Sequence, residues 1–319
     1  MKILITGGAG FIGSNLAFAL LENKEVSFVR VLDNFATGSP DNIKTLKQNN
    51  KFELVEGDIR KYEDCLKACE NIDLVSHQAA LGSVPRSIKD PITTNEVNIG
   101  GTLNIFNAAK EKGIKRVVYA ASSSTYGDHP GLPKVEDKIG NPLSPYAVTK
   151  YVNELYARVY YNAYGLETIG LRYFNIFGPR QSPNGPYAAV IPLFAEALLE
   201  NRAPLINGDG KQSRDFTYVD NAVLANKLAL FTENKEAVNE VYNIACGEQT
   251  SLLELYEYLR EIAGSTLLPT HGPERKGDVK YSLADISKAA RLLNYKPVVT
   301  IKEGLKKTFD WYKERFQDK

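Results

Sequence analysis

Residues 2–13 read KILITGGAGFIG, a short apolar run followed at once by a glycine-rich segment. Residues 2–6 fit a buried strand, and residues 11–22 carry apolar side chains at the spacing of a helix. Gly7, Gly10 and Gly13 lie at the junction, where glycine allows a sharp turn and lets a pyrophosphate approach the backbone at the helix N-terminus. The segment therefore predicts the strand–turn–helix unit that binds dinucleotides.

This pattern continues through the first half of the chain, where apolar runs alternate with segments of helix length. Gly113 and Gly165 supply stop signals for two predicted helices, and Pro145 suits the first turn of the second. Strands separated by helices predict an α/β fold with a doubly wound parallel sheet of the Rossmann type. We predict helices at residues 98–111 and 146–164, and strands at residues 2–6, 26–32, 52–55, 73–76, 116–120 and 168–173.

Beyond about residue 175 the pattern changes. Turn-rich stretches there alternate with helices predicted at residues 191–200, 220–231 and 301–316. A chain of 319 residues has room for one large or two smaller domains. We therefore predict a Rossmann domain over residues 1–178 and a smaller mixed α/β substrate domain over residues 179–319, with chain segments that interleave near the boundary.

The charge of the chain is nearly balanced, with 39 Lys and Arg against 38 Asp and Glu. This balance argues against a nucleic-acid or membrane-surface binder, which needs a positive excess. The sequence shows no apolar stretch of about 20 residues, no secretory signal and no disulfide framework for its three cysteines, so we expect a cytoplasmic protein. His77, His129 and His271 have no Cys or carboxylate at ligand spacing, so we expect no metal site.

Two aspartates follow predicted strands at positions where a dinucleotide would meet them. Asp33 lies 20 residues past Gly13, where a carboxylate can accept hydrogen bonds from both ribose hydroxyls. It would repel a 2′-phosphate, and the next residue, Asn34, brings no positive charge, so NAD is favoured over NADP. Asp58, directly before Ile59, is placed to meet the adenine, although a Gly-Asp pair also makes an ordinary turn.

A tyrosine and a lysine four residues apart begin one of the long predicted helices. Tyr146 and Lys150 project from one face of it, a spacing that is also common among helix-surface residues. Ser122 and Ser123 follow a predicted strand, at the sheet edge where ligands bind. An ammonium and a bound nicotinamide cation both lower the pKa of a neighbouring tyrosine, which can then deprotonate an alcohol while hydride leaves the same carbon.

Together the three glycines, Ser122, Tyr146 and Lys150 resemble the motifs of the extended short-chain dehydrogenase/reductases, which are mostly nucleotide-sugar enzymes. The resemblance covers essentially the whole chain and includes His77-Gln78-Ala79-Ala80 and Arg172-Tyr173-Phe174-Asn175. It implies that Ser122, Tyr146 and Lys150 are catalytic. It also implies that NAD contacts Gly7, Gly10, Phe11, Ile12, Gly13, Asp33, Asn34, Asp58, Ile59, Ala79, Ala80, Asn98, Tyr146, Lys150 and Tyr173.

The residues that follow Ser122 distinguish among the reactions of this family. Sugar-nucleotide dehydratases carry an Asp-Glu pair there and related decarboxylases a Glu, whereas this chain has Ser123-Ser124-Thr125 and resembles the 4-epimerases. The resemblance implies that Tyr146 takes the O4 proton of the sugar while C4 passes hydride to NAD+. The 4-keto sugar then turns over and receives the hydride on its other face, which regenerates a tightly bound NAD.

The second half of the chain resembles the part of these enzymes that binds a UDP-sugar. Arg214 and Arg275 match diphosphate-binding arginines, although either alone is more often part of a surface ion pair. Asn175 would add a phosphate contact and Asp278 a ribose contact. The implied substrate contacts are Ser83, Ser122, Ser123, Asn175, Gln181, Ala189, Val190, Asn207, Arg214, Arg275, Asp278 and Ser282.

Substrate choice depends most on Ser282, which falls where epimerases restricted to glucose and galactose carry a bulky Tyr. A small side chain leaves room for a 2-acetamido group, and Ser83 and Gln181 lie in stretches similar to bacterial UDP-N-acetylglucosamine 4-epimerases. We therefore predict interconversion of UDP-GlcNAc and UDP-GalNAc. UDP-glucose and UDP-galactose, the C6-oxidised UDP-GlcNAcA, and a non-catalytic NAD-binding regulatory protein remain alternatives. The helices at 98–111 and 146–164 match a four-helix dimer interface of this family, which implies a homodimer.

Overall fold

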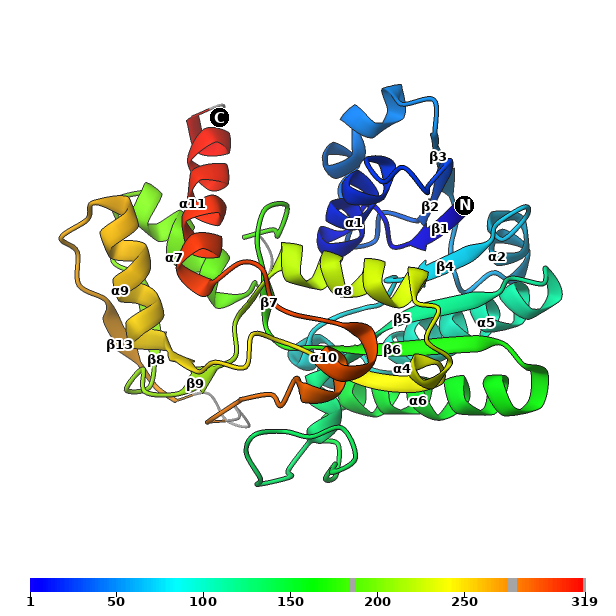
Figure 1. Cartoon of the computed structure of the whole chain (residues 1–319). Coiled ribbons are helices and arrows are strands. Elements are labelled where there is room, and N and C mark those ends of the chain that lie inside the picture. Colours follow the sequence, from blue (N-terminus) through cyan, green and yellow to red (C-terminus); the bar gives the residue numbers. More distant parts are fainter. Residues whose placement is uncertain (184–187, 275–279, 318–319) are drawn as a thin grey trace.

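The computed structural model describes residues 1–183, 188–274 and 280–317. A seven-stranded parallel sheet runs through its larger part, with strand order β11-β6-β5-β4-β1-β2-β3 (Figure 1). The chain fills the sheet outward from β1 to β3 and then crosses to β4, so the predicted doubly wound Rossmann fold is confirmed. The strands are β1 (Lys2–Thr6), β2 (Phe28–Asp33), β3 (Phe52–Glu56), β4 (Leu74–His77), β5 (Arg116–Ser122), β6 (Glu167–Tyr173) and β11 (Glu240–Ile244).

All six strands expected from the sequence are present, each with its ends within two residues of the prediction. The seventh strand, β11, lies in the second half of the chain, where no strand is predicted, and pairs with β6 at the edge of the sheet. The division at residue 178 remains a prediction. The structure shows that a segment from beyond that residue completes the large sheet.

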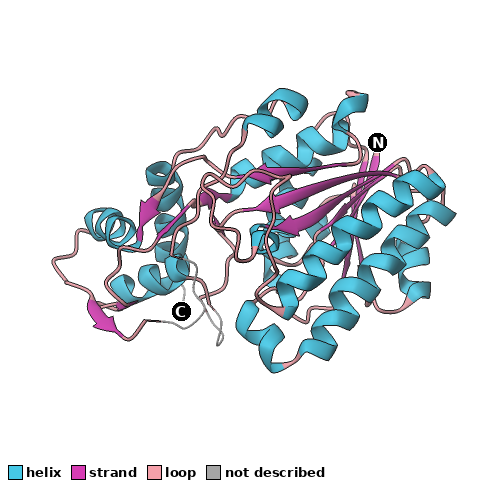
Figure 2. Cartoon of the chain, turned by 90° about the horizontal axis from the view of Figure 1, so that it is seen from below, coloured by secondary structure: helices cyan, strands magenta, loops and turns pink. Residues whose placement is uncertain are grey.

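Helices cover both faces of this sheet, as Figure 1 shows. α1 and α8 pack together on one face, and α2, α5 and α6 pack on the other. Seen from below in Figure 2, long helices of the second face lie across the strands. The central strands are therefore buried on both sides, as a parallel sheet requires, while the edge strand β3 is only half-buried. The bounds are α1 (Phe11–Leu21), α2 (Tyr62–Ala68), α3 (Val84–Lys89), α4 (Pro91–Asn95), α5 (Gly101–Glu111), α6 (Pro145–Tyr164) and α8 (Val219–Phe231).

The second half of the chain also forms a smaller part with three two-stranded sheets (Figure 1). Its helices α7 (Val190–Leu199), α9 (Leu252–Ala263) and α11 (Ile301–Gln317) pack on one another, whereas α10 (Ser287–Leu293) packs on β11 and α8 of the larger part. Within the described ranges, no helix has both the length and the apolar character to cross a membrane. The paired strands are β7 (Ile176–Phe177) with β10 (Thr217–Tyr218), β8 (Leu205–Asn207) with β13 (Thr270–Gly272), and β9 (Ser213–Arg214) with β12 (Thr250–Ser251).

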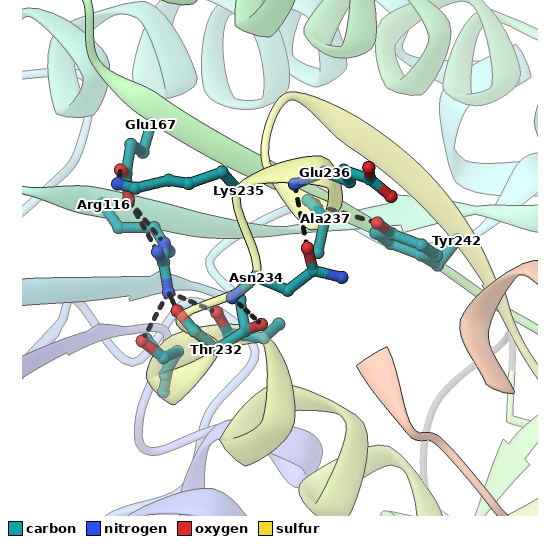
Figure 3. Close-up of polar contacts among 10 residues, drawn as sticks. Arg116, Glu167, Thr232, Asn234, Lys235, Glu236, Ala237 and Tyr242 are labelled. Atoms are coloured by element: carbon teal, nitrogen blue, oxygen red, sulfur yellow. Dashed lines mark hydrogen bonds and ion pairs between the residues drawn. The ribbon is translucent and has the colours of Figure 1, made fainter. Parts of the chain in front are cut away.

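A buried arginine fixes the end of α8 to the large sheet (Figure 3). Arg116 begins β5, and its Nη2 lies 2.6 Å from a carboxylate oxygen of Glu167, its register partner on β6. Its Nη1 donates to three main-chain oxygens at the C-terminal end of α8, those of Ala229, Leu230 and Thr232, at 2.8–3.1 Å. A cation at this end also complements the helix dipole. This arrangement sets where α8, which returns from the second half of the chain, lies on the sheet.

Candidate active site

A cavity of about 470 Å³ lies at the carboxyl ends of the strands of the large sheet. Its walls include residues at or directly after the ends of β1, β2, β3, β4, β5 and β6. Ligands bind at this edge of an open α/β sheet, close to the point where the strand order reverses. Of the residues expected to contact NAD, all but Asn98 line the cavity.

Close backbone packing shapes the cavity at the glycine-rich turn. Gly7 has a φ of +68°, and a Cβ at this position would lie 2.7 Å from the Cα of Ala79. A Cβ on Gly13 would lie 2.2 Å from the main-chain oxygen of Gly7. Any side chain at either position would therefore displace the turn or the segment after β4. The turn opens onto the N-terminus of α1, where Phe11 and Ile12 line the cavity, and this surface fits a pyrophosphate.

At the end of β2, the carboxylate of Asp33 is held by the backbone and faces the same cavity. Its two oxygens accept hydrogen bonds from the N–H groups of Ala9 and Phe35, both at 2.8 Å. Burial raises the pKa of Asp33, and these backbone hydrogen bonds counteract the rise. A fixed carboxylate at this position fits the ribose of an adenosine and opposes a 2′-phosphate.

The expected adenine contact, Asp58, lies beside Asp33 in the cavity wall. Arg60 pairs with it at 2.6 Å, and the side chain of Asn34 donates to it at 3.1 Å. The hydrogen bond from Arg60 lowers the pKa of Asp58, so this carboxylate is charged at neutral pH. The adenosine end of the cavity therefore carries two oriented carboxylates.

Ser122, Tyr146 and Lys150 come together at the opposite end of the cavity. Ser122 ends β5, while Tyr146 and Lys150 lie on the first two turns of α6. Ser144 caps that helix by accepting the N–H of Ala147 at 3.2 Å. Lys150 Nζ lies 5.9 Å from the centre of the Tyr146 ring, so the two side chains are neighbours, with Lys150 buried and Tyr146 half-buried.

The buried position shifts the pKa values of both groups on α6. Burial lowers the pKa of Lys150 to about 8, and burial raises the pKa of Tyr146, while a hydrogen bond with Ser122 acts in the opposite direction. From the sequence we expect a lowered pKa for Tyr146, because two positive charges, Lys150 and a bound nicotinamide, are assumed to act on the phenol. Among the protein's own groups, desolvation of the phenolate is the largest influence. The protein's own groups therefore do not lower the pKa of Tyr146 by themselves.

A second cavity of about 280 Å³ adjoins the first, because Asn175 and Ile176 line both. Four further residues expected to contact the substrate line it, namely Ala189, Val190, Asn207 and Arg214. Arg214 lies on β9, and its Nη1 donates to the main-chain oxygens of Ser213 at 2.9 Å and Lys280 at 3.2 Å. The two cavities thus meet at Asn175 and Ile176, and the second has a cation, Arg214, in its wall.

The sequence model of the NAD dependent epimerase/dehydratase family matches residues 3–245. The chain belongs to this family. A UDP-glucose 4-epimerase from Mycolicibacterium smegmatis is 36% identical over 99% of this chain and 100% of its own. The solved structure of a UDP-N-acetylglucosamine 4-epimerase from Methanobrevibacter ruminantium is 38% identical, with a TM-score of 0.92 over 98% of both chains. That of a UDP-glucuronic acid 4-epimerase from Bacillus cereus is 36% identical, with a TM-score of 0.91 over 99% of this chain and 100% of that one.

Family membership and these relatives make the protein an isomerase that uses NAD as its cofactor. The B. cereus structure contains UDP-glucuronic acid together with NAD. The glycine-rich turn, the fixed carboxylate of Asp33, and Tyr146 and Lys150 in the cavity wall fit this cofactor in the epimerase described here.

Some of the residues expected to contact the substrate lie outside these two cavities. Ser83 caps α3 by accepting the N–H of Arg86 at 3.2 Å, and Ser123 is half-buried in the turn after β5. Gln181 lines a third cavity of about 420 Å³ beside α11, which shares Phe11 and Thr37 with the wall of the first cavity. Ser282 is half-buried next to β9, where its N–H donates to the oxygen of Ser213 at 3.1 Å. Arg275 and Asp278 lie outside the described residues.

Asn98 lies behind the cavity wall. The sequence predicts that a helix begins at residue 98, but a turn of π-helix, Glu96–Gly100, precedes α5 and carries this side chain. Its Oδ1 accepts the N–H of Leu81 at 2.8 Å, and its Nδ2 donates to the hydroxyl of Thr149 at 3.1 Å. Asn98 therefore joins the segment after β4, which lines the cavity, to the helix that carries Tyr146.

Several lining residues of the epimerase lie beyond the sequence prediction. Gln78 stands inside the recognised His77-Gln78-Ala79-Ala80 stretch, and that position after β4 was the available signal. Phe216 lies two residues after Arg214, in the same turn-rich stretch, and lines the nucleotide-side cavity. Thr37, Arg60, Gln212 and Leu252 also line one of the two cavities, and no pattern in their neighbourhood distinguishes them from ordinary turn and helix residues.

Proposed function

We propose that this enzyme interconverts UDP-GlcNAc and UDP-GalNAc by inverting the configuration at C4. The observation that carries the choice of sugar is the small side chain of Ser282 beside β9, the strand of Arg214. The resemblance to the 4-epimerases implies that a bulky Tyr at this position goes with restriction to plain hexoses, and Ser282 lacks that bulk. The M. ruminantium relative, named a UDP-N-acetylglucosamine 4-epimerase, supports the same choice.

The two adjoining cavities suggest how the substrate lies. The second cavity, with Arg214 and the N-terminal end of α7, would hold the uridine diphosphate. Its junction with the cofactor cavity at Asn175 would hold the sugar. C4 of the sugar would then face Ser122 and Tyr146.

The proposed roles of the catalytic residues follow from their positions. When bound, NAD supplies an acceptor and donor for the hydride of C4. Tyr146 takes the proton from O4 and later returns it, while Ser122 hydrogen-bonds the same oxygen. The ammonium of Lys150 favours the phenolate form of Tyr146. Ser123-Ser124-Thr125 provide no carboxylate for elimination, so the 4-keto sugar is retained until it is reduced again.

We also propose a homodimer that forms through α6. The apolar stripe of this helix faces outward, with Val148 45%, Leu155 47% and Val159 52% exposed. Contiguous exposed apolar residues on one helix are typical of a protein interface.

Cys65, Cys69 and Cys246 are free thiols, which fits the expected cytoplasmic location.

The proposal is tested by offering three substrates to the purified enzyme without added cofactor. UDP-GlcNAc, UDP-Glc and UDP-GlcNAcA are incubated separately, and the C4 epimers of each are resolved. The proposal predicts that UDP-GlcNAc reacts fastest. Faster conversion of UDP-Glc would reject the argument from Ser282, and faster conversion of UDP-GlcNAcA would assign the C6-oxidised sugar. A stoichiometric need for added NADH would indicate a one-way reductase.

A further inference from the structure

Tyr173 is the second tyrosine in the wall of the cofactor cavity, and its hydroxyl is held by two side-chain amides. The Nδ2 of Asn226 donates to the Tyr173 hydroxyl at 2.7 Å. The hydroxyl in turn donates to the Oε1 of Gln78 at 3.1 Å. Gln78 lines the same cavity, whereas Asn226 does not line it and is fully buried on α8. A residue outside the cavity thus holds two residues of its wall.

The amide groups of Gln78 and Asn226 are completely satisfied, so their orientations follow from the hydrogen bonds. The Nε2 of Gln78 donates to the hydroxyl of Ser76 at 2.9 Å and to the Oδ1 of Asn226 at 3.0 Å. That Oδ1 also accepts the Ser76 hydroxyl at 3.1 Å, and the second N–H of Asn226 goes to the main-chain oxygen of Ala222 at 2.8 Å. Reversing Gln78 would place its amide oxygen against the Oδ1 of Asn226, and reversing Asn226 would place its amide nitrogen against the Nε2 of Gln78.

This closed network sets the position of Tyr173 relative to the catalytic end of the cavity. Tyr173 ends β6 and is the register partner of Ser122 at the end of β5. Burial raises the pKa of Tyr173 to about 12, so its hydroxyl stays protonated while it donates to Gln78. Tyr173 therefore forms a fixed, neutral part of the wall beside the residues that would move protons.

We propose that Asn226 is a positioning residue for NAD, which acts by holding Gln78 and Tyr173 in the cavity wall next to Ser122. The position of Asn226 is itself fixed because Arg116 anchors the C-terminal end of α8 to the sheet. Loss of the Asn226 amide would remove one of the two hydrogen bonds of the Tyr173 hydroxyl and one of the two that Gln78 Nε2 donates, and we expect both side chains to become less firmly held in the cavity wall. The proposal depends on NAD as the cofactor and is independent of the identity of the sugar.

Asn221 provides a matched control on the same helix. It is also fully buried and satisfied, because its Nδ2 donates to the oxygen of Val299 at 2.8 Å and its Oδ1 accepts the N–H groups of Val298 and Val299. It lines neither the cofactor cavity nor the adjoining one. Asn221→Ala and Asn226→Ala therefore each remove a buried side-chain amide from α8, but only the amide of Asn226 is hydrogen-bonded to residues that line the cofactor cavity.

The test measures how fast the NAD of the purified holoenzyme exchanges with isotopically labelled NAD, together with the melting temperature. We expect Asn226→Ala to accelerate exchange roughly tenfold or more, while Asn221→Ala lowers the melting temperature and leaves exchange within about twofold of the wild-type rate. Tyr173→Phe, which removes only the hydroxyl, should accelerate exchange, and adding Asn226→Ala to it should have a less than additive effect. Wild-type exchange in Asn226→Ala, or equal acceleration in both asparagine variants, would overturn the proposal.

Discussion

Lys150 Nζ donates to the main-chain oxygen of Ala120 at 2.8 Å. This bond ties the ammonium of α6 to β5 two residues before Ser122. It also partly compensates the burial of a positive charge, since the carbonyl replaces one hydrogen bond to water. The lysine is thereby placed next to Tyr146 and close to the strand end that carries Ser122.

The lowered pKa of Lys150, about 8, predicts how stability depends on pH. Below pH 8 the lysine is protonated in both the folded and the unfolded protein, and the folded state carries the full cost of the buried ammonium. As the pH rises from about 8 to 10.5, the unfolded state binds more protons and this cost is relieved, by on the order of 3 kcal/mol. Urea denaturation across this range should show the rise in the wild type. Lys150→Met should lack it, and an equal rise in both proteins would contradict the assignment.

Asp33 should determine both the affinity for NAD and the discrimination against NADP. Asp33→Asn removes the negative charge, and we expect the dissociation constant for NAD to rise about 10–100-fold, because hydrogen bonds to a charged group contribute about 1.5–3 kcal/mol. The affinity for NADP relative to NAD should increase. Asp41→Asn removes an equal charge from an exposed position near Asp33 and serves as the control. Equal NAD binding by the two variants, measured by calorimetry, would argue against the ribose contact.

Ser282 should control which sugar is accepted. Ser282→Tyr adds bulk beside β9, and we expect its kcat/KM for UDP-GlcNAc to fall at least about tenfold while that for UDP-Glc changes little, since about 1.4 kcal/mol of steric conflict suffices for this ratio. Ser282→Ala removes the hydroxyl without adding bulk, and it should leave the ratio of the two values unchanged. Parallel losses on both sugars in Ser282→Tyr would show that position 282 does not read the acetamido group.

The outward stripe of α6 should hold the dimer together. Leu155→Glu places a charge in the middle of this stripe, and burying it in an interface would be costly, so we expect a monomer by size exclusion with light scattering. Leu268→Glu is the control, because Leu268 is a more exposed leucine that is not part of α6. A dimer that survives Leu155→Glu would place the interface elsewhere.

The sequence predicted the large sheet well because its strands are short, apolar and separated by helices. It did not predict β11, since this short stretch is interrupted by the polar residues Glu240 and Asn243 and lies in a region where the sequence predicts no other strand. The π-helical turn at Glu96–Gly100 could not be predicted from the sequence either, because one extra residue in a turn leaves the helical spacing on either side intact. Asn98, which was expected to contact NAD, instead joins the segment after β4 to α6 through hydrogen bonds to Leu81 and Thr149.

The residues of the candidate site also fall into those that the sequence predicts and those that it does not. Motif residues such as Asp33 and Tyr146 were found because they stand at fixed distances from strand and helix ends. The apolar stripe of α6 marks the helix correctly, but spacing alone cannot say which face is buried. Here Lys150 and Glu154 face inward, with Glu154 paired to Arg172 at 2.7 Å, while Leu155 faces outward. Asn226 could not be found from the sequence, because its role depends on α8 returning to the sheet.

The most direct test of the central claim is C4 epimerisation of UDP-GlcNAc by the purified enzyme without added cofactor, compared with that of Tyr146→Phe. We predict that the wild type reaches an equilibrium of UDP-GlcNAc and UDP-GalNAc. Tyr146→Phe should retain its NAD and lose activity roughly 10²-fold or more, because only the proton-transferring hydroxyl is removed. Wild-type rates in Tyr146→Phe, or no epimer formed by a wild-type enzyme that contains NAD, would contradict the mechanism.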